Sequence, residues 1–258
     1  MPQIAVAGHA LEYTWTDGTR DGSPTLVFLH EGLGSIRQWR DFPAQVARAS
    51  GCRALVYDRY GYGNSAVLQE ARVGTDFMHR EALVFLPALL QALNIDKPVL
   101  IGHSDGASIA LIHAGAGHPV RGVAVMAPHV FIEDLCIRSI QKAAAQFETT
   151  DLPERLAKYH RDARKTFHLW ADAWLDPAFR DWNIEPSLPA IRCPVLAIQG
   201  EDDAYGTLAQ LDAIARQVGG TCERLKLPQC GHAPHLERPQ LVLTALTDFL
   251  KKTLGTDC

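Results

Sequence analysis

The sequence predicts an α/β protein with a mainly parallel sheet, helices on both faces and one all-helical insertion. Short continuous apolar runs, which are typical of strands covered on both faces, alternate with helical stretches along the chain. The alternation stops over about residues 131–187 and then resumes. We therefore expect a core formed by 1–130 and 188–258, with a helical cap at the carboxyl ends of the strands, where open α/β sheets bind ligands.

The first half of the chain alternates regularly. Residues 37–50 are expected to form a helix that Gly51 ends, and residues 76–93 carry apolar side chains at helical spacing with Pro87 as a kink. A further helix is expected to continue to Gly117. The segment 11–16 alternates in polarity, as an early strand does. Continuous apolar runs predict the other strands, at 25–29, 54–57, 99–101 and 120–126.

The second half begins with the helical stretch. Residues 131–182 are predicted to be helical with breaks at 149–151 and 176–177, and they are rich in large aromatic side chains that we expect to be core residues. Three prolines between residues 186 and 194 mark the return to alternation. The remaining predicted elements are strands at 195–199 and 222–227 and helices at 208–218 and 239–254.

Composition and charge exclude several classes of partner. Hydrophobic residues make up 47% of the 258 residues and charged residues 21%, which suits one large globular core. The net charge of −4 gives no reason to expect nucleic acid or an anionic membrane as a partner. No apolar run reaches the roughly 20 residues that span a bilayer. A small-molecule substrate is the expected partner, and the sequence does not indicate an oligomeric state.

Two features favour a cytoplasmic location. Residues 1–11 lack the basic and apolar segments of a secretory signal. The six cysteines include no Cys-x-x-Cys pair, and in a chain of this size they indicate reduced thiols. These cysteines are Cys52, Cys136, Cys193, Cys222, Cys230 and Cys258.

A nucleophile motif follows the strand predicted at 99–101. The sequence Gly-His-Ser-Asp-Gly at 102–106 fits the pattern Gly-x-Ser-x-Gly, and small residues open the helix behind it. A strand that turns into a helix within about one residue strains the serine backbone and exposes its hydroxyl group. Glycine occupies both ends of the motif because a Cβ there would meet neighbouring backbone. The free N–H groups of the helix would then point towards a substrate.

A serine hydroxyl needs a base, and His232 is the best candidate among the 11 histidines. It lies in a loop flanked by glycine and proline, at the sheet edge where the serine motif also ends. The alternative interpretation is a histidine of a surface loop. Six other histidines are expected to have no catalytic role. His113 and His118 are predicted to lie in or just after the helix behind the serine, and His9, His79, His160 and His168 at the surface or at helix caps.

The third member of such a group is a carboxylate that holds the imidazole tautomer. The loop after the penultimate strand offers Glu201, Asp202 and Asp203, whereas residues 127–129 after the preceding strand offer none. Charge alone does not separate Asp202 from Asp203. The alternative is that this loop is an acidic turn that caps the following helix.

Four motifs in this order resemble the α/β-hydrolase superfamily, in its serine branch with a helical cap between the sixth and seventh strands. They are the loop at His30, the pattern Asp-x-x-Gly-x-Gly-x-Ser at 58–65, the motif at 102–106, and Gly231-His232. The resemblance covers nearly the whole chain. It implies a mostly parallel sheet of eight strands with helices on both faces.

The resemblance also implies roles for particular residues. In that family the acid lies three residues after the loop glycine, which corresponds to Asp203. The triad would be Ser104, Asp203 and His232, in the chain order of the family. The oxyanion hole would be formed by the backbone N–H groups of Asp105 and Gly32.

One loop departs from the family pattern. The family usually has His-Gly at this place, whereas this chain has His30-Glu31-Gly32. A carboxylate near a developing oxyanion would raise the barrier unless it faces away or is paired. Arg59 is one candidate partner for Glu31, and the alternatives are that Glu31 is exposed or that it contacts the substrate. We take Glu31, His30 and His103 as candidate substrate-binding residues.

No cofactor or metal site is expected. The motif at 102–106 is not a phosphate-binding loop, because no Gly-Lys-Ser or Gly-Lys-Thr follows it. His232 and His235 are three residues apart, but no further cysteine, histidine or carboxylate completes a set of ligands.

Taken together, the motifs predict a serine hydrolase that cleaves a small or medium carboxylic ester, thioester or lactone through an acyl-enzyme. One alternative is hydrolysis of a carbon–carbon bond in a ring-cleavage product. Capped relatives do this with the same triad, but they often carry tryptophan directly after the histidine, where this chain has Ala233. Another alternative is a non-catalytic member that binds a small ligand, although none of the three triad residues is missing. Dehalogenase and epoxide hydrolase relatives need aspartate in place of Ser104.

Overall fold

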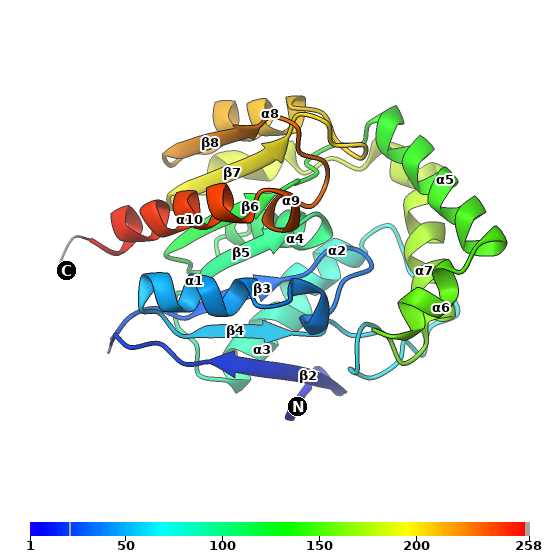
Figure 1. The fold of residues 1–258 in the computed structure, drawn as a ribbon, viewed down its shortest axis with the longest axis horizontal. Coiled ribbons are helices and arrows are strands. Elements are labelled where there is room, and N and C mark those ends of the chain that lie inside the picture. The colour runs from blue at the N-terminus through cyan, green and yellow to red at the C-terminus, as the bar shows by residue number, and fades with distance from the viewer. Residues whose placement is uncertain (21, 256–258) are drawn as a thin grey trace.

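A computed structural model describes residues 1–20 and 22–255. Its centre is an eight-stranded sheet in the order β1-β2-β4-β3-β5-β6-β7-β8 (Figure 1). β1 pairs with β2 and β2 with β4 in antiparallel fashion, and every other neighbouring pair is parallel, which confirms the predicted sheet. The strands are β1 (Gln3–Val6), β2 (His9–Thr16), β3 (Leu26–Leu29), β4 (Ala54–Tyr57), β5 (Val99–His103), β6 (Gly122–Met126), β7 (Val195–Gly200) and β8 (Cys222–Leu227).

Helical elements connect nearly all of these strands. In the first half they are η1 (Ile36–Trp39), α1 (Phe42–Ser50), α2 (Phe77–Arg80), the π-helical turn η2 (Glu81–Phe85), α3 (Leu86–Ala92) and α4 (Asp105–Gly115). In the second half they are α5 (Asp134–Thr149), α6 (Leu152–Ala157), α7 (Ala163–Leu175), η3 (Pro177–Asp181), η4 (Glu185–Ala190), α8 (Ala209–Gln217), α9 (Pro234–Glu237) and α10 (Pro239–Leu254).

The helices cover both faces of the sheet, as predicted. Successive side chains of a strand point to opposite faces, so the buried strand β3 contributes to two cores. Leu26 and Phe28 belong to the core that includes α1 and α10, which lie in front of the sheet in Figure 1. Val27 and Leu29 belong to the core that includes α3, α4 and α8. This burial on both faces explains why the parallel strands are continuous apolar runs.

Two predicted helices are interrupted at prolines. The segment predicted as one helix over 37–50 is split into η1 and α1 at Arg40, which has a φ of 54°. A continuous helix would bring the Pro43 ring against a carbonyl one turn earlier, whereas the restart places Pro43 in the first turn of α1. In the segment 76–93, Pro87 lies in the first turn of α3, directly after the wide π-helical turn. The helical geometry therefore changes just before Pro87, and the kink expected at this proline stays a prediction.

The chain between β6 and β7 contains the helices of the insertion that the sequence predicted at 131–187. Its helices α5, α6 and α7 lie together beyond the ends of the parallel strands, at the right in Figure 1. The two ends of the insertion meet, because the Ile184 N–H donates to the Val130 carbonyl at 2.8 Å and Phe131 forms a bridge with Asn183. The exact domain boundaries at 131 and 187 stay a prediction.

His160 holds the insertion against the core. Its Nδ1 accepts the N–H of Gly63 at 2.9 Å, and its Nε2 donates to the carbonyl of Leu33 at 3.0 Å. The imidazole is buried, so the prediction of a surface or cap position for His160 was wrong. Both partners lie in core loops far away in the sequence, and a helical pattern gives no information about such contacts.

Candidate active site

Ser104 lies at the junction of β5 and α4. Its φ of 52° and ψ of −119° are in a strained region for a residue with a side chain, as predicted for this turn. A Cβ at position 102 would overlap the backbone of Gly106, and one at position 106 would overlap the carbonyl oxygen of Leu29. The two glycines therefore allow α4 to start directly behind the serine.

Three side chains from three loops form a continuous chain of hydrogen bonds. Nε2 of His232 lies 2.9 Å from Oγ of Ser104. On the other side of the ring, Nδ1 of His232 lies 2.8 and 2.9 Å from the two carboxylate oxygens of Asp203. The structure thus brings together the three residues that the sequence proposed as a triad.

The surroundings of Asp203 keep its carboxylate ionised. Its oxygens also accept the side-chain amide of Gln199 at 2.7 Å and the N–H of Tyr205 at 2.8 Å. Burial alone would raise the pKa of Asp203, but the hydrogen bond and the charge of His232 outweigh it and lower the pKa. Because the carboxylate accepts from Nδ1, the Nε2 of His232 is free to accept the proton of Ser104. Asp202 is exposed instead.

Two backbone N–H groups beside Ser104 are available to a ligand. Asp105 is the first residue of α4, so its N–H has no partner within the helix. The N–H of Gly32 makes no hydrogen bond within residues 1–20 and 22–255. The loop of Gly32 is fixed at the Glu31 carbonyl, which accepts from the N–H of Gly34 at 3.1 Å and from Arg59 at 2.7 Å.

Ser104 and these two residues line one cavity. The insertion supplies part of its wall from α5 and α7, and the core loops supply the rest. The lining residues are Glu31, Gly32, Leu33, Ser104, Asp105, His129, Cys136, Ile140, Trp170, Trp174, Tyr205 and His232.

With this geometry established, comparison with known proteins places the chain in a family. The model of the alpha/beta hydrolase family matches residues 26–245. The chain belongs to the alpha/beta hydrolase family. It is 26% identical over 259 residues to the 2-succinyl-6-hydroxy-2,4-cyclohexadiene-1-carboxylate synthase of Salmonella paratyphi A, covering 89% of this chain and 95% of that protein. The synthase of the same name from Enterobacter sp. (strain 638) is 27% identical over 277 residues, covering 92% and 95%.

Solved structures show the same fold. The enol-lactonase from Burkholderia xenovorans LB400 has a TM-score of 0.76 and 23% identity, covering 97% of this chain and all of that one. A proline iminopeptidase from Mycobacterium smegmatis has a TM-score of 0.78 and 18% identity, covering 98% of both chains.

The predicted substrate-binding residues of this hydrolase have different positions. Glu31 lines the cavity, whereas His30 and His103 do not. His30 is fully buried under its own loop, where Nδ1 donates to the Glu31 carbonyl at 2.8 Å and Nε2 accepts the Arg59 N–H at 3.1 Å. Burial and the nearby charge of Arg59 hold the pKa of His30 well below its ordinary value. His30 is therefore a neutral residue that shapes the loop.

The partner of the Glu31 carboxylate is His103 and not Arg59. Oε2 of Glu31 lies 3.3 Å from Nδ1 of His103. The guanidinium of Arg59 donates instead to the main-chain carbonyl of Glu31. Burial alone would raise the pKa of Glu31, but the hydrogen bond and charge of His103 lower it well below its ordinary range. The carboxylate beside the serine cavity is therefore both ionised and paired.

The sequence did not identify the hydrolase residues that shape the cavity from the insertion. Trp170 and Trp174 of α7 line it, whereas the sequence did not separate the aromatic side chains of the core from those that line a pocket. The indole nitrogens of both are buried without a hydrogen-bond partner within residues 1–20 and 22–255. The many large aromatic residues in this part of the sequence were the available indication of a pocket wall. Their number does not reveal which side chains of a helix face the serine.

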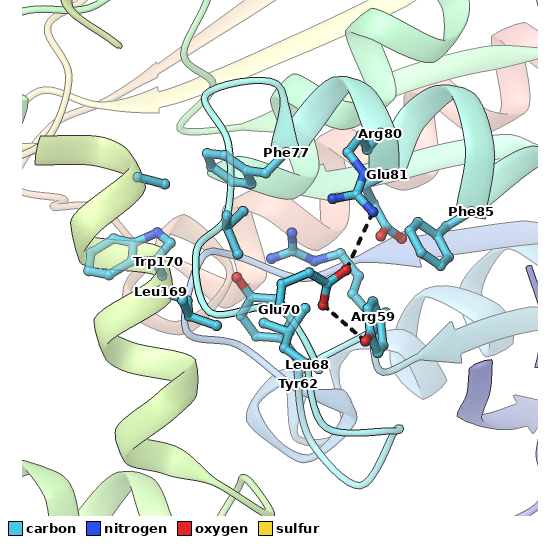
Figure 2. A pocket seen from close by; sticks show the side chains of 13 residues that line it. Arg59, Tyr62, Leu68, Glu70, Phe77, Arg80, Glu81, Phe85, Leu169 and Trp170 are labelled. Atoms are coloured by element: carbon cyan, nitrogen blue, oxygen red, sulfur yellow. Dashed lines mark hydrogen bonds and ion pairs between the residues drawn. The ribbon is translucent and has the colours of Figure 1, made fainter. Parts of the chain in front are cut away.

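Trp170 also lines a second cavity. Figure 2 shows Trp170 and Leu169 of α7 at one side and the side chains of Arg80, Glu81 and Phe85 opposite. Glu70 forms an ion pair with Arg80 at 3.5 Å and accepts the hydroxyl of Tyr60 at 3.0 Å (Figure 2). This second cavity is therefore lined by both charges and by aromatic rings.

The described part of the hydrolase contains no group of three or more histidines, cysteines, aspartates or glutamates that could hold a metal ion. None of the helices in residues 1–20 and 22–255 is long and apolar enough to cross a membrane. Five cysteines have free thiols, and Cys258 lies outside the described residues.

Proposed function

We propose that this protein is a serine hydrolase that cleaves a small or medium carboxylic ester, or a thioester or lactone, through an acyl-enzyme. The observation that carries the proposal is the continuous hydrogen-bond chain from Ser104 through His232 to the buried carboxylate of Asp203. A serine is a weak nucleophile unless a base accepts its proton, and this arrangement supplies the base and fixes its tautomer.

The geometry supports a two-step reaction. Oγ of Ser104 attacks the acyl carbonyl while Nε2 of His232 takes its proton, and Asp203 stabilises the imidazolium that forms. The N–H groups of Gly32 and Asp105 stabilise the oxyanion of the tetrahedral intermediate. Its collapse expels the alcohol or thiol, which receives the proton from His232. Water, deprotonated by His232, then attacks the acyl-enzyme. The second tetrahedral intermediate collapses with cleavage of the bond to Oγ, which releases the carboxylic acid, and His232 returns the proton to Ser104.

The charges of the cavity favour a neutral acyl group. Among the described residues, no lysine or arginine lines it, whereas the carboxylate of Glu31 does. Leu33, Ile140 and the two tryptophans provide apolar walls. A substrate carboxylate in this space would lose hydration without gaining a cationic partner. We therefore favour a neutral ester or lactone over a carboxylate-bearing substrate of the kind that the name of the Salmonella synthase indicates.

The assay of the nucleophile uses p-nitrophenyl acetate and butyrate with the wild type and Ser104→Ala. The substitution should lower kcat by at least about 10³-fold, because nucleophile and base act as a unit. Ser50→Ala, at the end of α1 and away from the cavity, is the matched serine control and should behave as the wild type. Activity of Ser104→Ala at the level of the wild type would exclude the mechanism.

Two esters of similar size test the substrate class. We expect p-nitrophenyl butyrate to be hydrolysed with a kcat/KM at least about tenfold above that of the p-nitrophenyl monoester of succinate, because only the latter buries a charge. A preference for the succinate ester would contradict the neutral acyl group, while leaving the role of Ser104 intact.

A further inference from the structure

His103 directly precedes the proposed nucleophile, and oxygen acceptors face both of its ring nitrogens. Nε2 lies 2.6 Å from the main-chain carbonyl of His232, and Nδ1 lies 3.3 Å from Oε2 of Glu31. A neutral imidazole would direct a lone pair at one of these oxygens. Both contacts are favourable only when both nitrogens carry a proton. The ring is 3% exposed, so water does not offer an alternative partner.

We propose that His103 is a cationic positioning residue that joins Glu31 to the His232 loop and thereby sets the alkaline limit of activity. Its N–H at Nε2 fixes the backbone of His232, the base of the hydrolase proposed above, on which this inference rests. Its charge neutralises Glu31, the carboxylate that occupies the family's glycine position beside Gly32. Without that cation, Glu31 would repel the oxyanion that forms in the same cavity.

The surroundings of His103 stabilise this charge. Burial alone would lower its pKa, but the hydrogen bond and charge of Glu31 and the carbonyl of His232 raise the pKa above the ordinary histidine value. The ring of His235 on α9 packs edge-on against His103 at 4.9 Å, and burial lowers the pKa of His235 to about 3, so that it stays neutral. The ionisable groups that act on or face His103 are Glu31, His129, Asp203, His232 and His235.

The expected pH dependence has a definite sign. Below its raised pKa, His103 holds both protons and the arrangement is intact. As the pH rises through that value, one proton leaves. Either the hydrogen bond to the His232 carbonyl or the bond to Glu31 is then lost, and the Glu31 charge is no longer neutralised. The value of kcat should therefore fall reversibly on the alkaline side, at a pH set by the loss of the His103 proton beside Glu31 and not by the triad.

Substitutions of the pair test this in pH profiles of kcat with p-nitrophenyl butyrate. Glu31→Gln removes the charge that stabilises the His103 cation, so the alkaline limb should move by about one pH unit or more to lower pH. His103→Gln retains an N–H donor but cannot titrate, so the limb should disappear, while kcat drops roughly tenfold because Glu31 is left unpaired. The double variant with both glutamines should recover most of that loss.

The chain offers a matched control in an exposed pair of the same type. Glu148 on α5 lies 3.5 Å from His168 on α7. Glu148→Gln should leave the alkaline limb where it is. An alkaline limb that Glu31→Gln does not move, or a double variant that is slower than His103→Gln, would overturn the proposal.

A spectroscopic measurement tests the protonation state of His103 without relying on activity. Histidine ring nitrogens labelled with ¹⁵N distinguish neutral from doubly protonated rings. In the wild type and in Ser104→Ala, we expect the midpoint of His103 deprotonation to lie above the ordinary histidine pKa of about 6.5. A midpoint at or below that ordinary value would refute the cation even if the protein hydrolyses esters. Activity retained by Ser104→Ala would refute the triad mechanism instead.

Discussion

At the scale of single residues, burial separates Asp203 from its neighbour. Asp202 and Asp203 carry the same charge, and only the resemblance to the family favoured Asp203. In the structure the side chain of Asp203 is fully buried and accepts hydrogen bonds from three different groups, whereas Asp202 is exposed. Position in the loop determines which carboxylate faces the imidazole, and charge does not.

This difference predicts unequal effects of two conservative substitutions. Asp203→Asn should lower kcat by roughly 10⁴-fold, because an amide that donates to Nδ1 would favour the wrong tautomer of His232. Asp202→Asn should stay within about twofold of the wild type, since an exposed charge away from the reacting atoms contributes little. The measurement is kcat for p-nitrophenyl butyrate at one pH. Equal and mild effects at both positions would contradict the assignment of the acid.

The Glu31–His103 contact is also a residue-scale finding, and the sequence did not predict it. The two residues are 72 positions apart, and the sequence suggested Arg59 as the partner of Glu31. Arg59 does reach this loop, but it binds the main-chain carbonyl. Formal charge indicates that a carboxylate needs a partner, whereas the path of the backbone decides which cation its oxygens meet.

At the scale of elements, the serine turn depends on how closely β5 and α4 approach each other. The helix starts one residue after the serine, and its first turn packs on the end of β3, where the Leu29 carbonyl lies against Gly106. This contact is between backbones, so no side chain can move aside to make room. The motif at 102–106 was recognisable from sequence because the steric demand fixes residue types at fixed spacing.

Gly106→Ala should therefore destabilise the protein by about 1–3 kcal/mol and impair catalysis, because the new methyl group displaces the start of α4. The matched control is Gly206→Ala, where a Cβ would have only ordinary contacts beyond 3.4 Å. Urea unfolding followed by far-ultraviolet circular dichroism measures the free energy of unfolding of both variants. A Gly106→Ala protein as stable and as active as the wild type would show that the turn tolerates a wider spacing.

At the scale of the whole molecule, buried neutral histidines connect the layers. His113 on α4 is 1% exposed, and its Nδ1 donates to the carbonyl of Ala82 in η2 at 2.8 Å. Burial is the main reason that its pKa is lowered from 6.5 to about 4, with a smaller effect of the stacked His118. Above pH 6.5 the histidine is neutral in both the folded and the unfolded chain and contributes no pH dependence.

Between pH 6.5 and 4 the unfolded chain binds a proton that folded His113 does not, so the free energy of unfolding decreases as the pH falls. Relative to His113→Asn, which retains a donor but does not titrate, the wild type should lose roughly 3 kcal/mol over this interval. Urea unfolding at pH 7.5 and 4.5 checks this, with His168→Asn on the exposed face of α7 as the control. A difference between the wild type and His113→Asn that does not change with pH would contradict a buried neutral His113.

Much of this protein could be predicted from its sequence because the causes are local. Alternating apolar runs and helical stretches indicate a mainly parallel sheet, and backbone crowding at the serine turn requires glycines at 102 and 106. What only the tertiary structure decided depends on distant segments: the burial of His160 under the insertion, the two tryptophans of α7 that face Ser104, and the pairing of Glu31 with His103. The physical reason is that residue spacing constrains backbone conformation, whereas side-chain partners across loops depend on the packing of the whole chain.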